Sequence, residues 1–413
     1  MTCRTHWAWY VLTASFATVF VHYSIRLGYG ILMPEMILSL QITKAQAGSI
    51  ATSFFLAYSI FAPLMGFLAD RVSARTLLVV SPLVLSAGTF LMGRPQTLVQ
   101  ACLSFFVVGV GASAMWTPVV TLVQRWFVSR RRGMALGILS ISYAIGYGMM
   151  GILLPPLADY SGWRSCWSLL AAMAFLLVPL NGIFIRTSPQ DLHLEPWGGG
   201  IEKNSPPPVQ QTPGKTPFRA LLRWPSLWMT GLSYFFISFS AYVFNLFIVT
   251  YGNLELKYPF AQAARLATAI AFAGIPGALL IPSLSDSIGR KKCLILINAG
   301  MTISILLIIW AGSTWSALLA AVSFYGIFYA SVWPMYAATA ADFFPREVTG
   351  SVLGFWTIFY GLALILAPVG GGYLADLTGT FESSFLAGVA SGCLATLFLL
   401  PLKKQEIKPF GLR

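Results

Sequence analysis

The sequence TLLVVSPLVLSAGTFLMG, residues 76–93, contains no charged side chain, and neither does PQTLVQACLSFFVVGVGASAMWTPVVTLVQ, residues 95–124, which begins directly after Arg94. A helix needs about 20 apolar residues to cross the hydrocarbon core of a bilayer. Each run is therefore long enough to form a membrane-spanning helix, and the single arginine between them marks a short loop.

The same pattern extends over the whole chain. Charge-free runs also occupy residues 45–69, 133–158, 165–185, 224–254, 266–285, 293–341, 348–375 and 383–402. The run 293–341 is too long for one helix and divides in two at Gly312-Ser313-Thr314, and residues 5–34 are interrupted only by Arg26. We therefore predict an all-α membrane protein with 12 transmembrane helices.

Composition and charge agree with this prediction. Of the 413 residues, 57% are hydrophobic and only 9% are charged, against about 25% charged in soluble proteins. The net charge of +13 needs no nucleic-acid partner, because with both termini cytoplasmic 20 basic residues fall in inner segments and 5 in outer loops. We expect a multi-pass protein of the cytoplasmic (inner) membrane, in contact with lipid.

The chain repeats itself around a polar linker. Residues 186–223 contain three consecutive glycines and three consecutive prolines, which predicts a cytoplasmic linker between bundles of residues 1–185 and 224–413. The end of the linker, within 217–228, has an amphipathic pattern. Asp70 recurs as Asp286 and Trp116 as Trp333, at nearly the same offset along the chain. Parallel six-helix repeats with a substrate site near the midplane between them are typical of transporters.

Two loop motifs resemble a known family. Residues 66–75 read GFLADRVSAR and residues 286–292 read DSIGRKK. Both resemble the inner-loop signature of the major facilitator superfamily, whose members work mostly as monomers. In that family the acidic and basic residues of this loop hold the two halves together on the cytoplasmic side. The resemblance implies this gating role for Asp70, Arg71, Arg75, Asp286 and Arg290.

A narrower resemblance lies between the predicted fourth and fifth helices. Arg125-Trp126-Phe127 followed by Arg131-Arg132-Gly133 resembles a stretch of the bacterial monocarboxylate and oxalate/formate porters. Several of those porters receive the substrate carboxylate with an arginine in the eighth helix. The corresponding segment here, residues 262–285, has no charge after Arg265. The substrate of that branch therefore does not follow from the resemblance.

Arg26 is the only charged residue expected deep in the membrane. All 13 acidic residues lie in loops or near helix ends, and intramembrane arginines face cavities or partners. His22 precedes Arg26 by four residues and Tyr29 follows it by three, so the three share a helix face. We expect Arg26 to bind an anionic substrate beside His22 and Tyr29. In the alternative, Arg26 binds backbone carbonyls or Glu35, or extends outward to water.

The remaining candidates are polar and aromatic. At the repeat offset that relates Asp70 to Asp286, Arg26 corresponds to Tyr242 and His22 to Ser238, which predicts a site with its charge in the first half only. The same aromatic side chains also pack helices together. The other expected substrate-lining residues are Tyr143, Tyr147, Tyr242, Asn245, Tyr329, Trp333, Trp356 and Tyr360.

These features predict a secondary transporter of a small organic anion, most simply a carboxylate, that works by alternating access. No Gly-Lys-Ser/Thr phosphate loop is present in the sequence, so ATP does not drive it. No cofactor or metal is expected. The coupling has three alternatives: His22 carries a proton, the substrate carries it as the free acid, or one anion exchanges for another.

Two other function classes compete with this interpretation. One is an exporter of amphipathic or aromatic compounds of the same superfamily, which the many Trp and Tyr residues permit. The other is a membrane enzyme or a channel. An enzyme would need a nucleophile–base pair or a metal cluster inside the membrane. The sequence offers neither, because His6 and His193 fall in cytoplasmic segments; we therefore expect no enzymatic activity.

Overall fold

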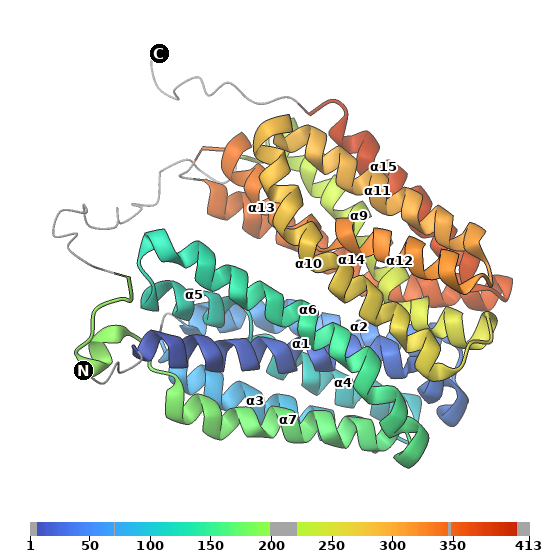
Figure 1. Ribbon diagram of the computed structural model, residues 1–413, viewed down its shortest axis with the longest axis horizontal. Helices are drawn as coiled ribbons and strands as arrows, with labels where there is room; N and C mark the ends of the chain where they lie inside the picture. The colour runs from blue at the N-terminus through green and yellow to red at the C-terminus, as the bar shows by residue number, and fades with distance from the viewer. Residues whose placement is uncertain (1–5, 70, 199–220, 346–347, 403–413) are drawn as a thin grey trace. The chain divides into compact units, whose positions relative to one another are not determined.

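The computed structural model describes residues 6–69, 71–198, 221–345 and 348–402, and these are almost entirely helical (Figure 1). Twelve of the described helical segments are long and apolar enough to cross a membrane. The predicted fold class, an all-α protein with 12 transmembrane helices, is confirmed. The chain divides into two compact units, Met1–Asn204 with Leu246–Thr268 and Ser205–Asn245 with Ala269–Arg413.

The first unit contains the first six spans. In it α1 packs against α6 and α7, α3 packs against α4 and α7, and α2 packs against α4. Its elements are α1 (Trp7–Leu40), α2 (Lys44–Ala69), α3 (Ala74–Met92), α4 (Leu98–Ala112), α5 (Thr117–Trp126), α6 (Ser129–Ser161), α7 (Trp163–Phe184) and the short helix η1 (Pro189–Leu192).

The second unit contains the other spans, except that the end of α9 and the start of α10 belong to the first unit. Here α11 packs against α12, α13 and α15, and α14 packs against α13 and α15. The elements are α9 (Pro225–Thr250) with its continuation η2 (Tyr251–Glu255), α10 (Phe260–Ile288), α11 (Arg290–Ala311), α12 (Trp315–Tyr329), α13 (Val332–Phe343), α14 (Thr349–Thr378) and α15 (Phe381–Leu399).

The predicted bundle limits stay predictions, because most of the linker lies outside the described residues. The same holds for the first part of the expected amphipathic segment, residues 217–220. Of its described remainder, residues 221–224 form a turn and residues 225–228 begin α9, and the Trp228 indole Nε1 donates back to the Leu222 carbonyl at 2.8 Å.

The repeat is visible in matching helix ends and interruptions. The fourth span breaks between α4 and α5, just before Thr117, and the tenth breaks between α12 and α13, just before Val332. Helix α3 starts after Ser73, whose hydroxyl accepts the Thr76 N–H. Its counterpart α11 starts after Gly289, whose φ of 92° favours glycine. The two equivalent helices therefore start differently, α3 with a side-chain cap from Ser73 and α11 with a glycine at positive φ.

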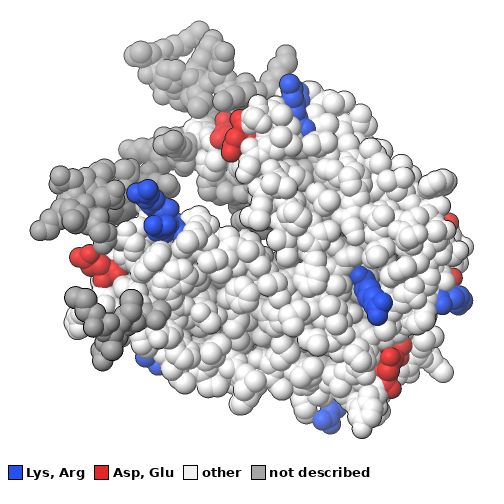
Figure 2. Space-filling view, viewed as in Figure 1, with Lys and Arg blue, Asp and Glu red and all other residues white. Residues whose placement is uncertain are grey.

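The lateral surface is suited to lipid. Figure 2 shows few charged side chains, separated by broad areas that carry none. Large apolar side chains such as Val99, Leu176 and Leu280 are 64–67% exposed. Because such exposure is costly in water and favourable in hydrocarbon, these helix faces fit a membrane-embedded protein.

Candidate substrate site

Arg26 lies in the middle of the first span and is buried. Helix α1 carries it, and only 8% of the residue is exposed, so the side chain does not extend outward to bulk water. Its guanidinium carbon lies 5.5 Å from the ring centre of Tyr23, 5.1 Å from that of Phe55 and 5.8 Å from that of Tyr58. Aromatic faces attract cations at such distances. Rings from α1 and α2 thus stabilise the buried charge.

His22 lies one turn before Arg26 and is completely buried. Its ring centre is 4.7 Å from that of Tyr23 and 6.4 Å from that of Tyr58. Among the described residues, neither imidazole nitrogen has a hydrogen-bond partner. Buried polar groups are nearly always satisfied by protein, water or ligand, so His22 is free to bind a group that enters the site.

Tyr23 connects Arg26 to a residue of the fifth span. Its ring centre lies 4.6 Å from that of Tyr143 on α6 and 6.0 Å from that of Trp116. We call the set Arg26, His22, Tyr23, Phe55, Tyr58 and Tyr143 the Arg26 cluster. The spacing of three residues between Tyr23 and Arg26 was a signal that sequence reasoning missed. No pattern in the sequence indicated Phe55 or Tyr58.

Tyr29 does not share the contacts of Arg26, although both lie on α1. Its hydroxyl donates to the Ala47 carbonyl at 2.6 Å, and its ring packs against Phe105 and Trp167 at 4.8 and 6.5 Å. These contacts pack α1 against α2 and α4, and the substrate-binding role of Tyr29 stays a prediction. Tyr147 on α6 is 2% exposed.

The second unit brings several of the expected residues together. The hydroxyls of Tyr242 on α9 and Tyr360 on α14 are 3.1 Å apart. Asn245 Nδ2 donates to the Tyr325 hydroxyl at 2.8 Å, and the Tyr325 ring stacks on Tyr329 with 5.7 Å between centres. Tyr242, Asn245, Tyr329 and Tyr360 thus belong to two hydrogen-bonded or stacked groups on the helices α9, α12 and α14.

The two expected tryptophans behave differently. Trp356 is 1% exposed, its indole Nε1 donates to the Leu227 carbonyl at 2.9 Å, and its ring packs against Phe344 at 5.6 Å. Trp356 therefore packs α14 inside its own unit, and its role as a substrate-lining residue stays a prediction. Trp333 on α13 is 56% exposed.

Comparison with known proteins shows where this architecture belongs. The sequence profile described as the Major Facilitator Superfamily matches residues 15–287 and 231–412. The chain belongs to the Major Facilitator Superfamily. By family it is therefore a multi-pass membrane transport protein.

Three curated relatives of this superfamily protein align over nearly the whole chain. A probable sulfoacetate transporter of Cupriavidus necator is 24% identical, covering 93% of this chain and 91% of the relative. A probable hexose phosphate transport protein of Chlamydia muridarum is 24% identical, with coverages of 94% and 88%. A hexuronate transporter of Bacillus subtilis is 22% identical, with coverages of 95% and 94%. None of these three tests the narrower resemblance to the monocarboxylate branch.

Solved structures of the superfamily share the fold. The crystal structure of a D-xylose–proton symporter has a TM-score of 0.77 at 14% identity, covering 96% of this chain and 98% of that one. An inward-facing, occupied bacterial homologue of the human lysosomal transporter Spinster gives 0.76 at 15% identity, covering 96% and 97%.

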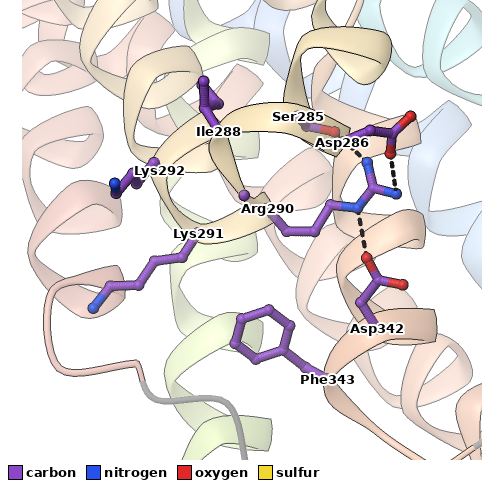
Figure 3. Close-up of a pocket in the computed structure, with 9 residues that line it drawn as sticks. Ser285, Asp286, Ile288, Arg290, Lys291, Lys292, Asp342 and Phe343 are labelled. Carbon is purple, nitrogen blue, oxygen red and sulfur yellow. Dashed lines mark hydrogen bonds and ion pairs between the residues drawn. The ribbon is translucent and has the colours of Figure 1, made fainter.

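The superfamily loop motif of the second unit forms a compact charged group (Figure 3). Arg290 pairs with Asp286 on the preceding helix at 2.7 Å and with Asp342 on α13 at 2.7 Å, and its guanidinium also donates to the Ser285 hydroxyl. These residues line a surface pocket together with Lys291, Lys292 and Phe343. The motif therefore ties the end of α10 and the start of α11 to α13.

The corresponding motif of the first unit is described only in part, because Asp70 lies outside the described residues. The Arg71 guanidinium lies 4.0 Å from the ring centre of Phe67. Arg75 donates through Nε and Nη2 to the Gly182 carbonyl at 3.1 and 2.6 Å, which satisfies a carbonyl near the end of α7. The gating roles of all five motif residues stay predictions.

The stretch Arg125-Trp126-Phe127 has a structural explanation. The buried Trp126 indole Nε1 donates to the Arg186 carbonyl at 2.9 Å. Trp197 N–H donates to the Trp126 carbonyl at 2.9 Å, and the Trp197 carbonyl accepts the Val128 N–H at 3.2 Å. The Trp197 ring packs against Phe127 and Trp9 at 5.7 and 5.0 Å. These contacts thus hold residues 186–197 against the helices of the first unit.

Proposed function

We propose that this protein is a secondary transporter of a small organic anion and that Arg26 binds the negatively charged group. The observation that carries the proposal is a buried guanidinium at mid-span, surrounded by aromatic rings and adjacent to His22, whose nitrogens have no partner among the described residues. A planar guanidinium matches a carboxylate, a sulfonate or a phosphate through paired hydrogen bonds.

The substrates of the relatives support an anion as cargo. Sulfoacetate, hexuronate and hexose phosphate, the substrates named for three relatives, differ in size and in acid group but all carry negative charge. A carboxylate is the simplest candidate. The Arg26 cluster contributes one cation, so one acidic group of the substrate would be bound there.

The direct test is binding to purified protein. We expect small carboxylates or sulfonates to raise the melting temperature in proportion to their concentration, as linkage requires, while neutral analogues of equal size do not. Arg26→Gln should abolish the shift. Arg26→Lys, which retains the charge but loses the planar fork, should weaken it about tenfold in Kd.

Arg94→Gln is the matched control, because Arg94 also lies over an aromatic ring, that of Phe90 at 4.5 Å, but near the end of α3. It should bind the anion as the wild type does. Normal anion binding by Arg26→Gln would reject the proposal. Retained transport of neutral amphipathic compounds by Arg26→Ala, with no anion binding in the wild type, would favour the exporter.

We further propose that the coupling ion is a proton carried at His22. Its burial beside Arg26 places a titratable group next to the bound anion. In proteoliposomes, uptake should then rise as the external pH falls and collapse with a protonophore, and His22→Gln should transport without response to pH. Uptake that ignores the protonophore but requires internal substrate would show anion exchange instead.

The proposed membrane orientation has both termini and the linker in the cytoplasm of a bacterial-type inner membrane, as the distribution of basic residues indicates. A thiol-reactive reagent that does not cross the membrane should therefore label a cysteine placed at Asp191 in inverted vesicles and not in intact cells. The opposite labelling would reverse the orientation.

A further inference from the structure

The pocket at the start of α11 lies where membrane-spanning helices reach the membrane surface. It has a volume of about 410 Å³, which is within the range of small-molecule sites. Its lining residues come from the junction of α10 and α11, two of the candidate spans, and from Asp342 and Phe343 at the end of α13. All of them belong to the second unit, so this unit alone forms the pocket.

The charged side chains of this pocket are unevenly matched, with three basic and two acidic residues. Arg290 pairs with both Asp286 and Asp342, so the two carboxylates already share a cation. Figure 3 shows Arg290 extending toward them, whereas Lys291 and Lys292 lie on the other side. No ion pair in the described part of the chain includes either lysine. The pocket therefore has a basic side that complements an anionic group.

The helix itself gives no reason for these lysines. A helix dipole disfavours basic side chains in the first turn, yet α11 begins with Arg290, Lys291 and Lys292. Lys291 is compensated, because its Nζ donates to the Leu400 carbonyl beyond the end of α15 at 2.7 Å. Lys292 is exposed and makes no hydrogen bond to the residues that the structure describes. An anion beside Lys292 would relieve this unfavourable concentration of positive charge.

An exposed apolar row on α10 leads to the pocket. Leu280, Leu284 and Ile288 are 67%, 43% and 37% exposed, and their spacing of four residues places them along one side of the helix. Ile288 itself lines the pocket. Such a row is unfavourable in water and suits the acyl chain of a lipid. A ligand with an anionic head and a hydrocarbon tail therefore matches both the lysines and the row.

We propose that this pocket binds the phosphate of an anionic phospholipid, with Lys292 as the main contact, Lys291 beside it and an acyl chain along the apolar row of α10. Basic pockets between membrane-spanning helices bind anionic lipid headgroups. A soluble phosphate has the same charge but gains nothing from the apolar row, so a lipid is the occupant that uses every feature. The site shares no residue with the Arg26 cluster and does not depend on the transported substrate.

The test measures lipid binding to the purified full-length protein in a neutral detergent. Native mass spectrometry would give the Kd of dioleoyl phosphatidylglycerol and of dioleoyl phosphatidylcholine, which has the same chains but no net charge. We expect phosphatidylglycerol to bind at least about fivefold more tightly, since one lysine near a headgroup contributes about that factor. Lys292→Gln should remove about fivefold of its affinity, and Lys292→Arg, which keeps the charge, should retain it.

Arg130→Gln is the matched control. Arg130 is an exposed basic residue in the first turn of α6. Helices α6 and α11 form the fifth and ninth spans, so both begin at the same membrane surface. The control therefore removes one positive charge from that surface outside the pocket, and it should leave the Kd of phosphatidylglycerol unchanged. Equal weakening by Arg130→Gln and Lys292→Gln would show a general attraction to basic residues and overturn the site.

Competition separates a lipid from a soluble phosphate. Inorganic phosphate and glycerol 3-phosphate at millimolar concentration should not displace phosphatidylglycerol, because neither contacts the apolar row. Displacement by either compound would make the pocket a site for soluble phosphates and reject the lipid. Equal binding of the two phospholipids, or unchanged phosphatidylglycerol binding by Lys292→Gln, would also reject the proposal. None of these results bears on Arg26, so the proposed function is tested separately.

Discussion

Lys44 and Glu255 form an ion pair with 2.8 Å between Nζ and Oε1, although they lie far apart in the sequence. Lys44 begins α2 and Glu255 ends η2, the continuation of α9. Close by in the chain, the Thr268 hydroxyl of α10 donates to the Gly148 carbonyl of α6 at 2.8 Å. These contacts explain why residues 246–268 belong to the first compact unit.

The Lys44–Glu255 pair should contribute measurable coupling. The two side chains are 18% and 19% exposed, so solvent screens the pair less than an open surface pair, and we expect about 1 kcal/mol. A double-mutant cycle of Lys44→Gln and Glu255→Gln on the free energy of unfolding measures this value. The exchanged variant Lys44→Glu with Glu255→Lys should recover part of the loss. Purely additive single effects would contradict the coupling.

Trp197 should stabilise the first unit without affecting substrate recognition. Its ring packs against Trp9 and Phe127, and its backbone bonds the Trp126 stretch on both sides. Trp197→Ala should therefore destabilise the unit by about 2–4 kcal/mol, while substrate Kd stays unchanged. Trp310→Ala, which removes an 84% exposed ring, should leave the melting temperature unaltered. A changed Kd in Trp197→Ala would contradict a purely structural role of this stretch.

The spans were predictable from sequence because each helix that crosses a bilayer needs about 20 consecutive residues that are mostly apolar and uncharged. Charge-free length placed most of the twelve helices, and Gly312-Ser313-Thr314 divided the run 293–341 at the site where α11 ends and α12 begins. The same rule gave no warning that the fourth span breaks before Thr117. The sequence did carry a different signal for this break, because Pro118 stands in the first turn of α5, a position that proline favours.

The candidate site was only partly predictable. A charge inside an apolar run is visible in sequence, so Arg26 could be singled out, together with His22 one turn before it; their substrate-binding roles stay predictions. Helical spacing also grouped Tyr29 with them, but its contacts differ from those of Arg26, because three residues place a side chain about 60° around the helix. That angle was enough to direct Tyr29 at Phe105. Phe55 and Tyr58 come from another helix, and their approach to Arg26 follows from packing that sequence periodicity does not contain.

The Arg290 contacts should affect transport more than stability. Asp286 and Asp342 have side chains 66% and 46% exposed, and exposed ion pairs contribute well under about 1 kcal/mol. We expect Asp342→Asn and Asp286→Asn to melt near the wild-type temperature but to change the rate of uptake severalfold, as the gating role implies. Asp159→Asn, an exposed acid outside the motif, should change neither. Normal uptake by both motif variants would remove the gating role.

Two glycines at equivalent positions of the repeat, Gly109 and Gly326, allow neighbouring helices to approach closely. We therefore predict that replacing either glycine by alanine has a similar destabilising effect. A Cβ on Gly109 would overlap the Phe54 carbonyl of α2, and a Cβ on its counterpart Gly326 would overlap the Ile270 carbonyl of α10. Because a backbone carbonyl cannot move without its helix, Gly109→Ala and Gly326→Ala should each lower the free energy of unfolding by about 1–3 kcal/mol in a chemical unfolding measurement.

Gly137 and Gly354, a second pair related by the repeat, are the controls, because they have nothing within 4 Å of a Cβ. Their alanine variants should be neutral or gain about 0.5–1 kcal/mol from reduced chain entropy. Equal effects at all four positions would show that helix propensity, rather than close approach of backbones, decides the result.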